Sequence, residues 1–515
     1  MLEPFRNEPL TDFRDDRNRS LFHAALDEER GRQGLTYPLL IGGRERMEGA
    51  TADSVNPARY GDVIGRVVQA DLRQAAEAVE AAHAAAAGWA REPFAVRARI
   101  LYRAAALLRR RKHEFSALMV LEAGKPWGEA DADTAEAIDF LDYYGREAER
   151  IGAPQPLIRL QGEDNELLYI PLGTGVVIPP WNFPLAIMAG MTAAALVCGN
   201  PVVFKPASPT AVIAARFVAL LLEAGLPEQA IQFVPGPGSV IGDALVDHPL
   251  TRFISFTGSL ETGLRIHERA SRLAKGQRWM KRVVAELGGK DAIVVDKSAD
   301  LEAAAEAIAA SAFGFSGQKC SACSRAIIHA GVYDRVLEDV VRRASGLRVG
   351  DPAEYGTDMG PVIDKAALRK IADYVEIGSG EGKIVWGGGT DDSYGYFAQP
   401  TIIEGVDRKA RVAQEEIFGP VLAFIRADDY GDALDIANDT AYGLAGSVFS
   451  GKRAHLEEAR RSFHVGNLYL NRKCTGALVG VHPFGGFNLS GTDSKAGGSD
   501  YLLQFTQAKA ISEKL

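Results

Sequence analysis

Short apolar runs alternate with helical stretches through two successive parts of the chain. In the first part, strands are expected at residues 176–178, 201–204, 231–234 and 253–256, and helices at residues 183–197, 211–224, 240–246 and 260–274. The second series runs from residue 291 to about 465, with strands expected at residues 292–295, 326–329, 383–385 and 421–426. Such alternation is typical of a parallel sheet covered by helices. The sequence therefore predicts an α/β protein with two Rossmann-like domains that face each other.

The segments outside these two series do not alternate between strands and helices. Residues 71–150 show helical spacing of apolar residues, and one of the helices there is expected to end at Gly124. Residues 1–37 are rich in charge and are expected to wrap the surface. The tail, residues 502–515, is expected to form an extended strand that pairs elsewhere.

The length and charge of the chain limit what it can be. With 515 residues the chain is too long for one hydrophobic core, so at least two domains are expected. The net charge of −9 disfavours a nucleic-acid-binding protein, although one local pocket can still attract a small anion. The longest apolar run, residues 185–199, is shorter than a bilayer span and is expected to be a buried helix.

Four cysteines in so long a chain are too few for a disulfide framework, and the first residues include acids rather than an apolar signal segment. A reducing, cytoplasmic location is therefore expected.

Cys320 lies in a glycine-punctuated stretch, and Glu286 lies in another glycine-rich turn upstream. A thiol that attacks an electrophilic carbon needs a base nearby, either for the thiol itself or for the water that releases the product.

Other interpretations of Cys320 remain open on these residues alone. A single cysteine is more often a small buried hydrophobic residue than a nucleophile. Cys320 and Cys323 form a CxxC pair, which also occurs in redox and zinc sites. A zinc site would need two more ligands at short spacing, and only His329 is close, so no metal is expected.

Glycine-rich turns follow several of the expected strands. The stretch from Phe256 to Gly263 opens a helix, where backbone N–H groups and the helix dipole can bind a diphosphate. Lys205 ends a strand, at the edge of a parallel sheet where nucleotides bind. Asn182 lies in another such turn and could donate to an oxyanion. Each of these features also occurs in ordinary turns.

Taken together, the motifs resemble the NAD(P)-dependent aldehyde dehydrogenase superfamily from Pro38 to the end of the chain. The motifs that carry the resemblance occur in the family's order: Pro180-Trp-Asn-Phe-Pro184, Lys205-Pro-Ala207, Phe256-Thr-Gly-Ser259, Glu286-Leu-Gly-Gly-Lys290, Gly317-Gln-Lys-Cys320, Glu416-Ile-Phe-Gly-Pro420 and Pro483-Phe-Gly-Gly486. The resemblance implies that Cys320 attacks the aldehyde carbon and that Asn182 stabilises the resulting oxyanion. Hydride transfer would leave a thioester, which Glu286 would help water to hydrolyse.

The resemblance also implies where the cofactor binds. Lys205 would hold the adenosine ribose, Ser259 the diphosphate and Glu416 the nicotinamide ribose. The full set of expected cofactor-binding residues is Ile178, Pro179, Trp181, Lys205, Ser208, Gly238, Gly242, Phe256, Gly258, Ser259, Gly263, Leu287, Gly288, Glu416 and Phe418. Ser208 stands where many NAD-specific relatives have Glu, and serine would not repel a 2′-phosphate. NAD is therefore expected as the cofactor, with tolerance of NADP.

Within the superfamily, the chain is similar to the branch that oxidises L-glutamate γ-semialdehyde. The similarity rests on Gln318-Lys-Cys-Ser-Ala322, Phe463-His-Val-Gly-Asn-Leu-Tyr469 and Arg472-Lys-Cys-Thr-Gly-Ala-Leu-Val-Gly480. By this resemblance, Ser321, Gly476 and Ala477 take the substrate carboxylate, and Phe183 and Phe484 enclose its aliphatic stem. Glu136 would accept from the ammonium group, unless it is simply a solvated residue on a helix face.

The resemblance further implies the organisation of the chain. A discontinuous dinucleotide-binding domain would comprise residues 1–153 and 173–288, and a catalytic domain residues 289–473. Residues 154–172 and 488–515 would form an arm that adds strands to a partner subunit, giving a homodimer or an assembly of dimers such as a hexamer. Two alternatives remain: an enzyme for another semialdehyde, such as succinate semialdehyde, and a non-catalytic protein that kept the fold.

Overall fold

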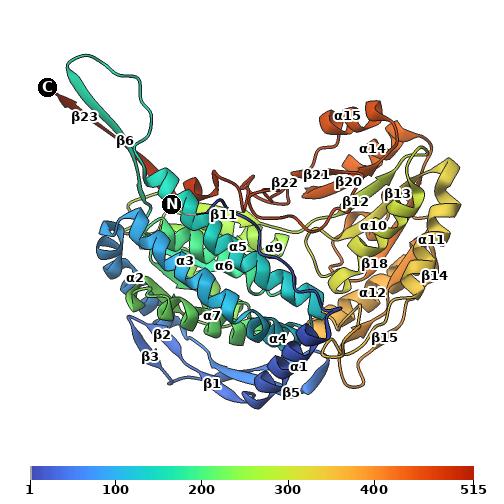
Figure 1. Cartoon of the computed structure of the whole chain (residues 1–515), viewed down its shortest axis with the longest axis horizontal. Coiled ribbons are helices and arrows are strands. Elements are labelled where there is room, and N and C mark those ends of the chain that lie inside the picture. Colours follow the sequence, from blue (N-terminus) through green and yellow to red (C-terminus); the bar gives the residue numbers. More distant parts are fainter. Residues whose placement is uncertain (1–2) are drawn as a thin grey trace.

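The computed structural model describes residues 3–515 and is built on two seven-stranded sheets (Figure 1). The first sheet has the strand order β11-β10-β7-β8-β9-β2-β3. Strands β11 to β9 run parallel to one another, whereas β2 and β3 are antiparallel additions at one edge. In that order the strands are Arg282–Glu286, Phe253–Thr257, Gly175–Ile178, Val202–Phe204, Ile231–Phe233, Leu39–Ile41 and Arg44–Arg46.

The second sheet has the order β14-β17-β18-β13-β12-β20-β21, and only its edge strand β14 is antiparallel. In that order the strands are Lys383–Trp386, Thr401–Glu404, Val421–Ala427, Cys323–His329, Asp291–Val295, Ala445–Phe449 and Asn467–Leu470. The predicted fold class, with two parallel-rich α/β sheets, is confirmed. The antiparallel edges were not predicted, because a short apolar run does not reveal the direction of its neighbour.

Helices cover both sheets. The expected helical region comprises α2 (Leu72–Arg91), α3 (Phe94–Arg110), α4 (Lys112–Ala123) and α5 (Trp127–Gly152). Helix α4 ends where expected, because Gly124 adopts a left-handed conformation with φ 70°. The other principal helices are α6 (Ala186–Val197), α7 (Ala211–Glu223), α9 (Leu260–Ala270), α10 (Leu301–Phe313), α11 (Tyr333–Ser345), α12 (Lys365–Glu381), α13 (Arg411–Gln414), α14 (Tyr430–Asn438) and α15 (Arg453–Ser462).

Three predicted helix boundaries differ from the structure. The helix expected from residue 183 begins at Ala186, whose N–H donates to the Asp133 carboxylate at 2.6 Å. The segment expected as a helix over residues 240–246 is a π-turn, Gly238–Gly242, followed by the short helix α8 (Asp243–Asp247). Helix α9 ends at Ala270 rather than at residue 274.

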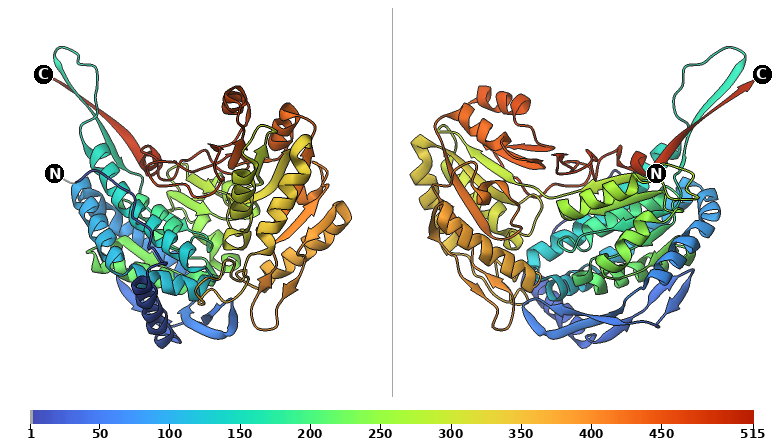
Figure 2. Two further views of the ribbon diagram at one scale, coloured as in Figure 1. Left: turned by 45° about the vertical axis from the view of Figure 1, so that its right-hand side comes forward. Right: turned by 180° about the vertical axis from the view of Figure 1, so that it is seen from behind.

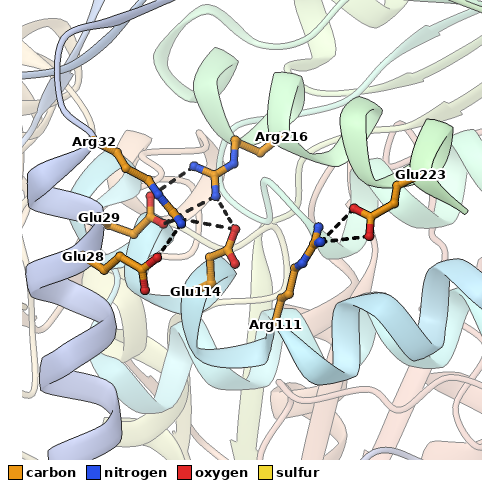
Figure 3. A network of polar contacts seen from close by, with 7 residues as sticks. All are labelled: Glu28, Glu29, Arg32, Arg111, Glu114, Arg216 and Glu223. Atoms are coloured by element: carbon orange, nitrogen blue, oxygen red, sulfur yellow. Dashed lines mark hydrogen bonds and ion pairs between the residues drawn. The ribbon is translucent and has the colours of Figure 1, made fainter.

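The N-terminal segment is more integrated than a surface wrap. Helix α1 (Asp16–Gly31) buries Phe22 and Leu26 completely. Its Glu29 pairs with Arg216 of α7 at 3.3 Å, and Arg216 also contacts Glu114 of α4, so the ion-pair network in Figure 3 joins three helices. A small sheet follows, formed by β1 (Leu35–Tyr37), β5 (Arg59–Val68) and β4 (Thr51–Asn56).

The C-terminal tail forms a paired strand as expected, but the strand begins at Thr506 rather than at residue 502, because Tyr501–Phe505 form a buried 3₁₀ turn. Strand β23 (Thr506–Lys514) pairs antiparallel with β6 (Glu163–Pro171), and Figure 2 shows this two-stranded ribbon projecting from the body. Minor two-stranded pairs are β15 (Thr390–Asp391) with β16 (Phe397–Ala398), and β19 (Tyr442–Gly443) with β22 (Phe487–Asn488). Among the described residues, no helix has the length and apolar character needed to cross a bilayer. Helix α6 is instead a buried core helix, as predicted.

Candidate active site

The candidate residues of the first sheet come from loops at one edge of it. Glu286 ends β11, Gly258 follows β10, Asn182 follows β7 and Lys205 follows β8. These are the carboxyl ends of parallel strands, where open α/β sheets bind ligands. The second sheet contributes Cys320 from the turn that precedes β13. The fold thus brings together side chains that are far apart along the chain.

The turn that presents Cys320 has an unusual backbone. Phe315, Ser316 and Gly317 adopt left-handed conformations in succession, with φ of 51°, 55° and 68°. A Cβ at Gly317 would lie 2.3 Å from the carbonyl oxygen of Gly419, so only glycine fits there. Non-glycine residues in this conformation are strained, and such strain persists at sites that the surrounding structure holds firmly.

The side chain of Gln318 holds this turn. It is fully buried, and its amide nitrogen contacts the carbonyl oxygens of Phe315 and Pro361 at 3.3 Å each. Its amide oxygen accepts from the N–H of Ile363 at 2.9 Å. The backbone N–H of Cys320 has no acceptor within residues 3–515 and is therefore free to donate to a ligand.

Two cavities meet at Cys320. The smaller, which we call the inner cavity, has a volume of about 120 Å³ and is bordered by Cys320 and Glu286. The larger, the outer cavity, has a volume of about 750 Å³. Thr257, Leu287 and Cys320 border both. A group bound in the outer cavity could therefore reach a substrate carbon attached to Cys320 in the inner one.

Glu286 has the environment of a tunable acid or base. Burial raises the pKa of Glu286 to about 8, although Ser494 and Lys495 oppose the shift. Its Oε1 accepts from the hydroxyl of Ser494, whereas Oε2 is buried without a partner within residues 3–515. An unpaired buried carboxylate oxygen is costly unless a ligand or water uses it. Glu286 is thus suited to take a proton from water in the inner cavity.

The electrostatic surroundings of Cys320 do not favour a resting thiolate. Burial raises the pKa of the Cys320 thiol, and the carboxylates of Asp291, Glu416 and Glu286 raise it further. The thiol must therefore lose its proton to a base when it attacks, and Glu286 is one of two carboxylates, with Glu136, that border the same inner cavity.

Asn182 supplies a side-chain donor close to the nucleophile. It is 4% exposed, and its amide nitrogen donates to the carbonyl oxygen of Gln318 at 3.1 Å. That bond uses one of two amide hydrogens, so the second remains for an oxyanion. Together with the free N–H of Cys320, this arrangement can stabilise negative charge beside the sulfur.

The inner cavity contains every residue predicted to bind the substrate: Glu136, Phe183, Ser321, Gly476, Ala477 and Phe484. Burial and the neighbouring Asp133 raise the pKa of Glu136 to about 8, while Lys125 opposes the shift. A cation placed against Glu136 would favour its ionised form. The carboxylate therefore has a place at the ligand site rather than on a solvated helix face.

Some residues that line the inner cavity were not predicted from the sequence. Phe140 lies one helical turn after Glu136 on α5, so spacing alone could have found it. Thr257 lies in the Phe256–Ser259 motif, although no role was predicted for it. For the others the sequence offers no signal, because they come from packed helices and distant loops: Ile187, Gly190, Met191, Leu444, Ala496 and Tyr501.

The outer cavity is bordered by most of the predicted cofactor residues: Ile178, Pro179, Trp181, Lys205, Gly238, Gly242, Phe256, Gly258, Ser259, Leu287, Gly288, Glu416 and Phe418. Two others do not reach its wall. Ser208 is exposed at the start of a 3₁₀ turn. Gly263 instead makes room for Leu287, whose Cδ2 would lie 2.3 Å from a Cβ at that position.

The outer cavity fits a dinucleotide. Burial lowers the pKa of Lys205 to about 8, and within residues 3–515 its ammonium donates only to the carbonyl oxygen of Pro206, at 3.3 Å, so it can bind hydroxyl groups. Ser259 caps α9, where N–H groups point toward the cavity. A Cβ at Gly238 or Gly242 would meet no atom within 4 Å, so a ligand can approach the backbone there. Sequence reasoning missed Lys370, Arg265 and Ile363 on this wall.

All four cysteines are free thiols. Cys323, the second member of the CxxC pair, is buried and its sulfur contacts the carbonyl oxygen of Arg325 at 3.5 Å. Within residues 3–515, no group of three or more His, Cys, Asp or Glu side chains is placed to hold a metal ion.

The chain matches the model of the aldehyde dehydrogenase family over residues 45–511. It is 59% identical over 513 residues to 1-pyrroline-5-carboxylate dehydrogenase of Geobacillus thermodenitrificans, and 58% identical over 515 residues to that of Bacillus cytotoxicus. Each alignment covers 100% of both chains.

The chain is also similar to solved structures of aldehyde dehydrogenases. The crystal structure of 1-pyrroline-5-carboxylate dehydrogenase from Thermus with bound NAD superimposes with a TM-score of 0.98 at 51% identity, and covers 100% of both chains. Betaine aldehyde dehydrogenase from Staphylococcus aureus in complex with NAD⁺ gives a TM-score of 0.89 at 27% identity, over 96% of this chain and 97% of the other.

Proposed function

Because the chain belongs to the aldehyde dehydrogenase family, we propose that it oxidises L-glutamate γ-semialdehyde to L-glutamate, the second step of proline degradation, with NAD as the oxidant. The observation that carries this assignment is the inner cavity. Its wall contains a thiol and a carboxylate that can perform the oxidation. The same wall contains hydrogen-bond donors for a carboxylate and an acceptor for an ammonium group, which suit an amino-acid head group. The 1-pyrroline-5-carboxylate dehydrogenases, at 57–59% identity over their full length, support the same substrate.

The chemistry begins at Cys320. Its sulfur attacks the aldehyde carbon, and the oxyanion of the thiohemiacetal accepts from the Asn182 amide and the Cys320 N–H. NAD, when bound, supplies the hydride acceptor, and Lys205, Ser259 and Glu416 would hold it. Covalent addition comes first because it converts the carbonyl into an alkoxide-like hydride donor. Loss of hydride leaves a thioester on the sulfur.

Hydrolysis of the thioester depends on Glu286. Its unpaired Oε2 can take a proton from water in the inner cavity, and the resulting hydroxide attacks the acyl carbon. The product acid then leaves Cys320 as the thiol. One side chain therefore forms the covalent bond, and a second one releases it.

Recognition of the head group uses other residues that line the inner cavity. The backbone N–H groups of Gly476 and Ala477 and the hydroxyl of Ser321 would take the carboxylate. Glu136 would accept from the ammonium group, and the rings of Phe183 and Phe484 would enclose the aliphatic stem.

We also propose some tolerance of NADP, because residue 208 is a serine and not a carboxylate that would repel a 2′-phosphate. The ratio of kcat/KM for NAD to that for NADP tests this point, and NADP turnover below the detection limit would refute it.

The proposed assembly is a homodimer or a set of dimers such as a hexamer, in the cytoplasm. The projecting ribbon of β6 and β23 supports it, because an unpaired strand edge invites pairing. Apolar side chains beside it are exposed: Leu157 by 44%, Ile158 by 96% and Leu160 by 59%. Sedimentation velocity of the intact chain and of a chain truncated before Thr506 would test the role of this arm.

A panel of semialdehydes assayed with NAD tests the substrate assignment. We expect kcat/KM for glutamate semialdehyde to exceed that for succinate semialdehyde, which lacks the ammonium group. A preference for succinate semialdehyde would favour the alternative enzyme. Inactivity of wild type toward every aldehyde, equal to that of Cys320→Ser, would instead indicate a non-catalytic protein.

A further inference from the structure

Arg472 lies outside the inner cavity, directly behind the turn that carries Gly476 and Ala477. We propose that Arg472 is a positioning residue that makes the inner cavity selective for aldehydes with a carboxylate, and this inference rests on the proposed function. It acts by fixing the direction of two peptide groups.

Arg472 donates hydrogen bonds to two successive backbone carbonyl groups. Its Nη2 donates to the carbonyl oxygens of Thr475 and Gly476, each at 3.1 Å. Gly476 has a φ of 78°, a left-handed conformation that glycine adopts without strain and that other residues rarely take. The positive φ therefore allows both carbonyls to converge on one guanidinium.

These two hydrogen bonds determine where the backbone N–H groups of Gly476 and Ala477 point. In a trans peptide the C=O and the following N–H point in opposite directions, and residues 3–515 contain no cis peptide bond. The N–H groups of Gly476 and Ala477 must therefore point away from Arg472. Both residues border the inner cavity, and neither N–H has an acceptor within residues 3–515. Two unpaired donors on successive residues are suited to a carboxylate.

Arg472 is itself held on other sides. Its guanidinium lies 4.3 Å from the centre of the Tyr469 ring, and its Nη1 is 3.1 Å from Nε2 of His482. The hydroxyl of Ser447 donates to its carbonyl oxygen at 2.5 Å. Burial and Arg472 both lower the pKa of His482, which favours an uncharged ring beside the guanidinium. These contacts keep the guanidinium in place before substrate binds.

Without Arg472, the peptide groups on either side of Gly476 can rotate, because glycine restricts them little. A rotated peptide would turn its carbonyl oxygen toward the substrate carboxylate and repel it. The loss should therefore appear in the binding of carboxylates and not in the chemistry at Cys320. An arginine with a purely structural role would affect all substrates alike.

The experiment compares Arg472→Ala and Arg472→Lys with wild type on glutamate semialdehyde and on butanal, which has no charged head group. Arg426→Ala is the matched control. Arg426 also stacks on a tyrosine, with its guanidinium 4.1 Å from the Tyr333 ring, and contacts the carbonyl oxygen of Ala330. It lies on β18, away from both cavities. A second readout is the inhibition constant of L-glutamate, measured with butanal as substrate.

For Arg472→Ala we expect KM for glutamate semialdehyde and the inhibition constant of L-glutamate to rise about tenfold or more, since hydrogen bonds to a charged group are lost. The kcat and KM for butanal should stay at the wild-type values. Arg472→Lys should recover part of the loss, and Arg426→Ala should match wild type throughout.

Two results would overturn the role of Arg472: an equal loss with both substrates, or no change in the inhibition constant of L-glutamate. In both cases wild type would still prefer glutamate semialdehyde to butanal, so the proposed function would stand. If wild type itself shows no such preference, the proposed function fails and the role of Arg472 fails with it.

Discussion

Glu286 and Cys320 border the same inner cavity, but only Cys320 also borders the outer one. The nucleophile can therefore meet the substrate on one side and the hydride acceptor on the other. The carboxylate meets only the space where substrate and water bind. This asymmetry separates the two half-reactions, oxidation at the junction of the cavities and hydrolysis within the inner one.

Replacement of Cys320 by Ala should abolish turnover, because Cys320 is the one thiol among the described residues that line the inner cavity. We expect kcat to fall by about 10³-fold or more. Binding of NAD, measured by calorimetry, should remain within about threefold of wild type, because the alanine removes only a small part of the outer cavity wall. Substantial residual turnover would place the nucleophile elsewhere.

The pH dependence of turnover should follow Glu286. Burial raises its pKa to about 8, so the carboxyl is mostly protonated at neutral pH and becomes a base as the pH rises. Where hydrolysis limits the rate, kcat should therefore increase through about pH 8 and then level off. A profile of kcat that falls across this range would contradict the role of Glu286 as the base.

Glu136→Gln should affect only substrates with an ammonium group. The ionised carboxylate attracts that group, whereas an amide of the same shape does not, so we expect KM for glutamate semialdehyde to rise about tenfold. KM for succinate semialdehyde should be unchanged, which makes it the internal control. Equal losses with both substrates would indicate a general packing role.

Arg216→Ala should destabilise the fold, because it leaves Glu29, whose side chain is 3% exposed, with fewer compensating charges. We expect a loss of about 2 kcal/mol in the free energy of unfolding, or a matching fall in Tm. Arg111→Ala is the control: it breaks a pair with Glu223 whose side chains are 38% and 46% exposed, and should cost less than about 1 kcal/mol. Equal effects would contradict the importance of burial.

Local pattern predicted the parallel strands and most helices, because apolar periodicity reflects burial directly. It could not predict that α1 is anchored by Phe22 and Leu26, since the many charges of that segment hide its apolar face. The site was predicted where motifs carry it, as at Cys320 and Glu286. Residues such as Leu444 and Tyr501 reach the inner cavity only through tertiary packing, which no local pattern encodes. The predicted domain boundaries and residue roles remain predictions.

The most direct measurement mixes Glu286→Gln with glutamate semialdehyde and NAD, and follows reduced nicotinamide together with the intact protein mass. We expect a burst of about one equivalent of reduced nicotinamide per site, then a steady rate at least about 100-fold below that of wild type. Protein quenched after the burst should carry the mass of a glutamyl thioester, and Cys320→Ala should carry none. Unchanged steady turnover with no mass increase would contradict the account.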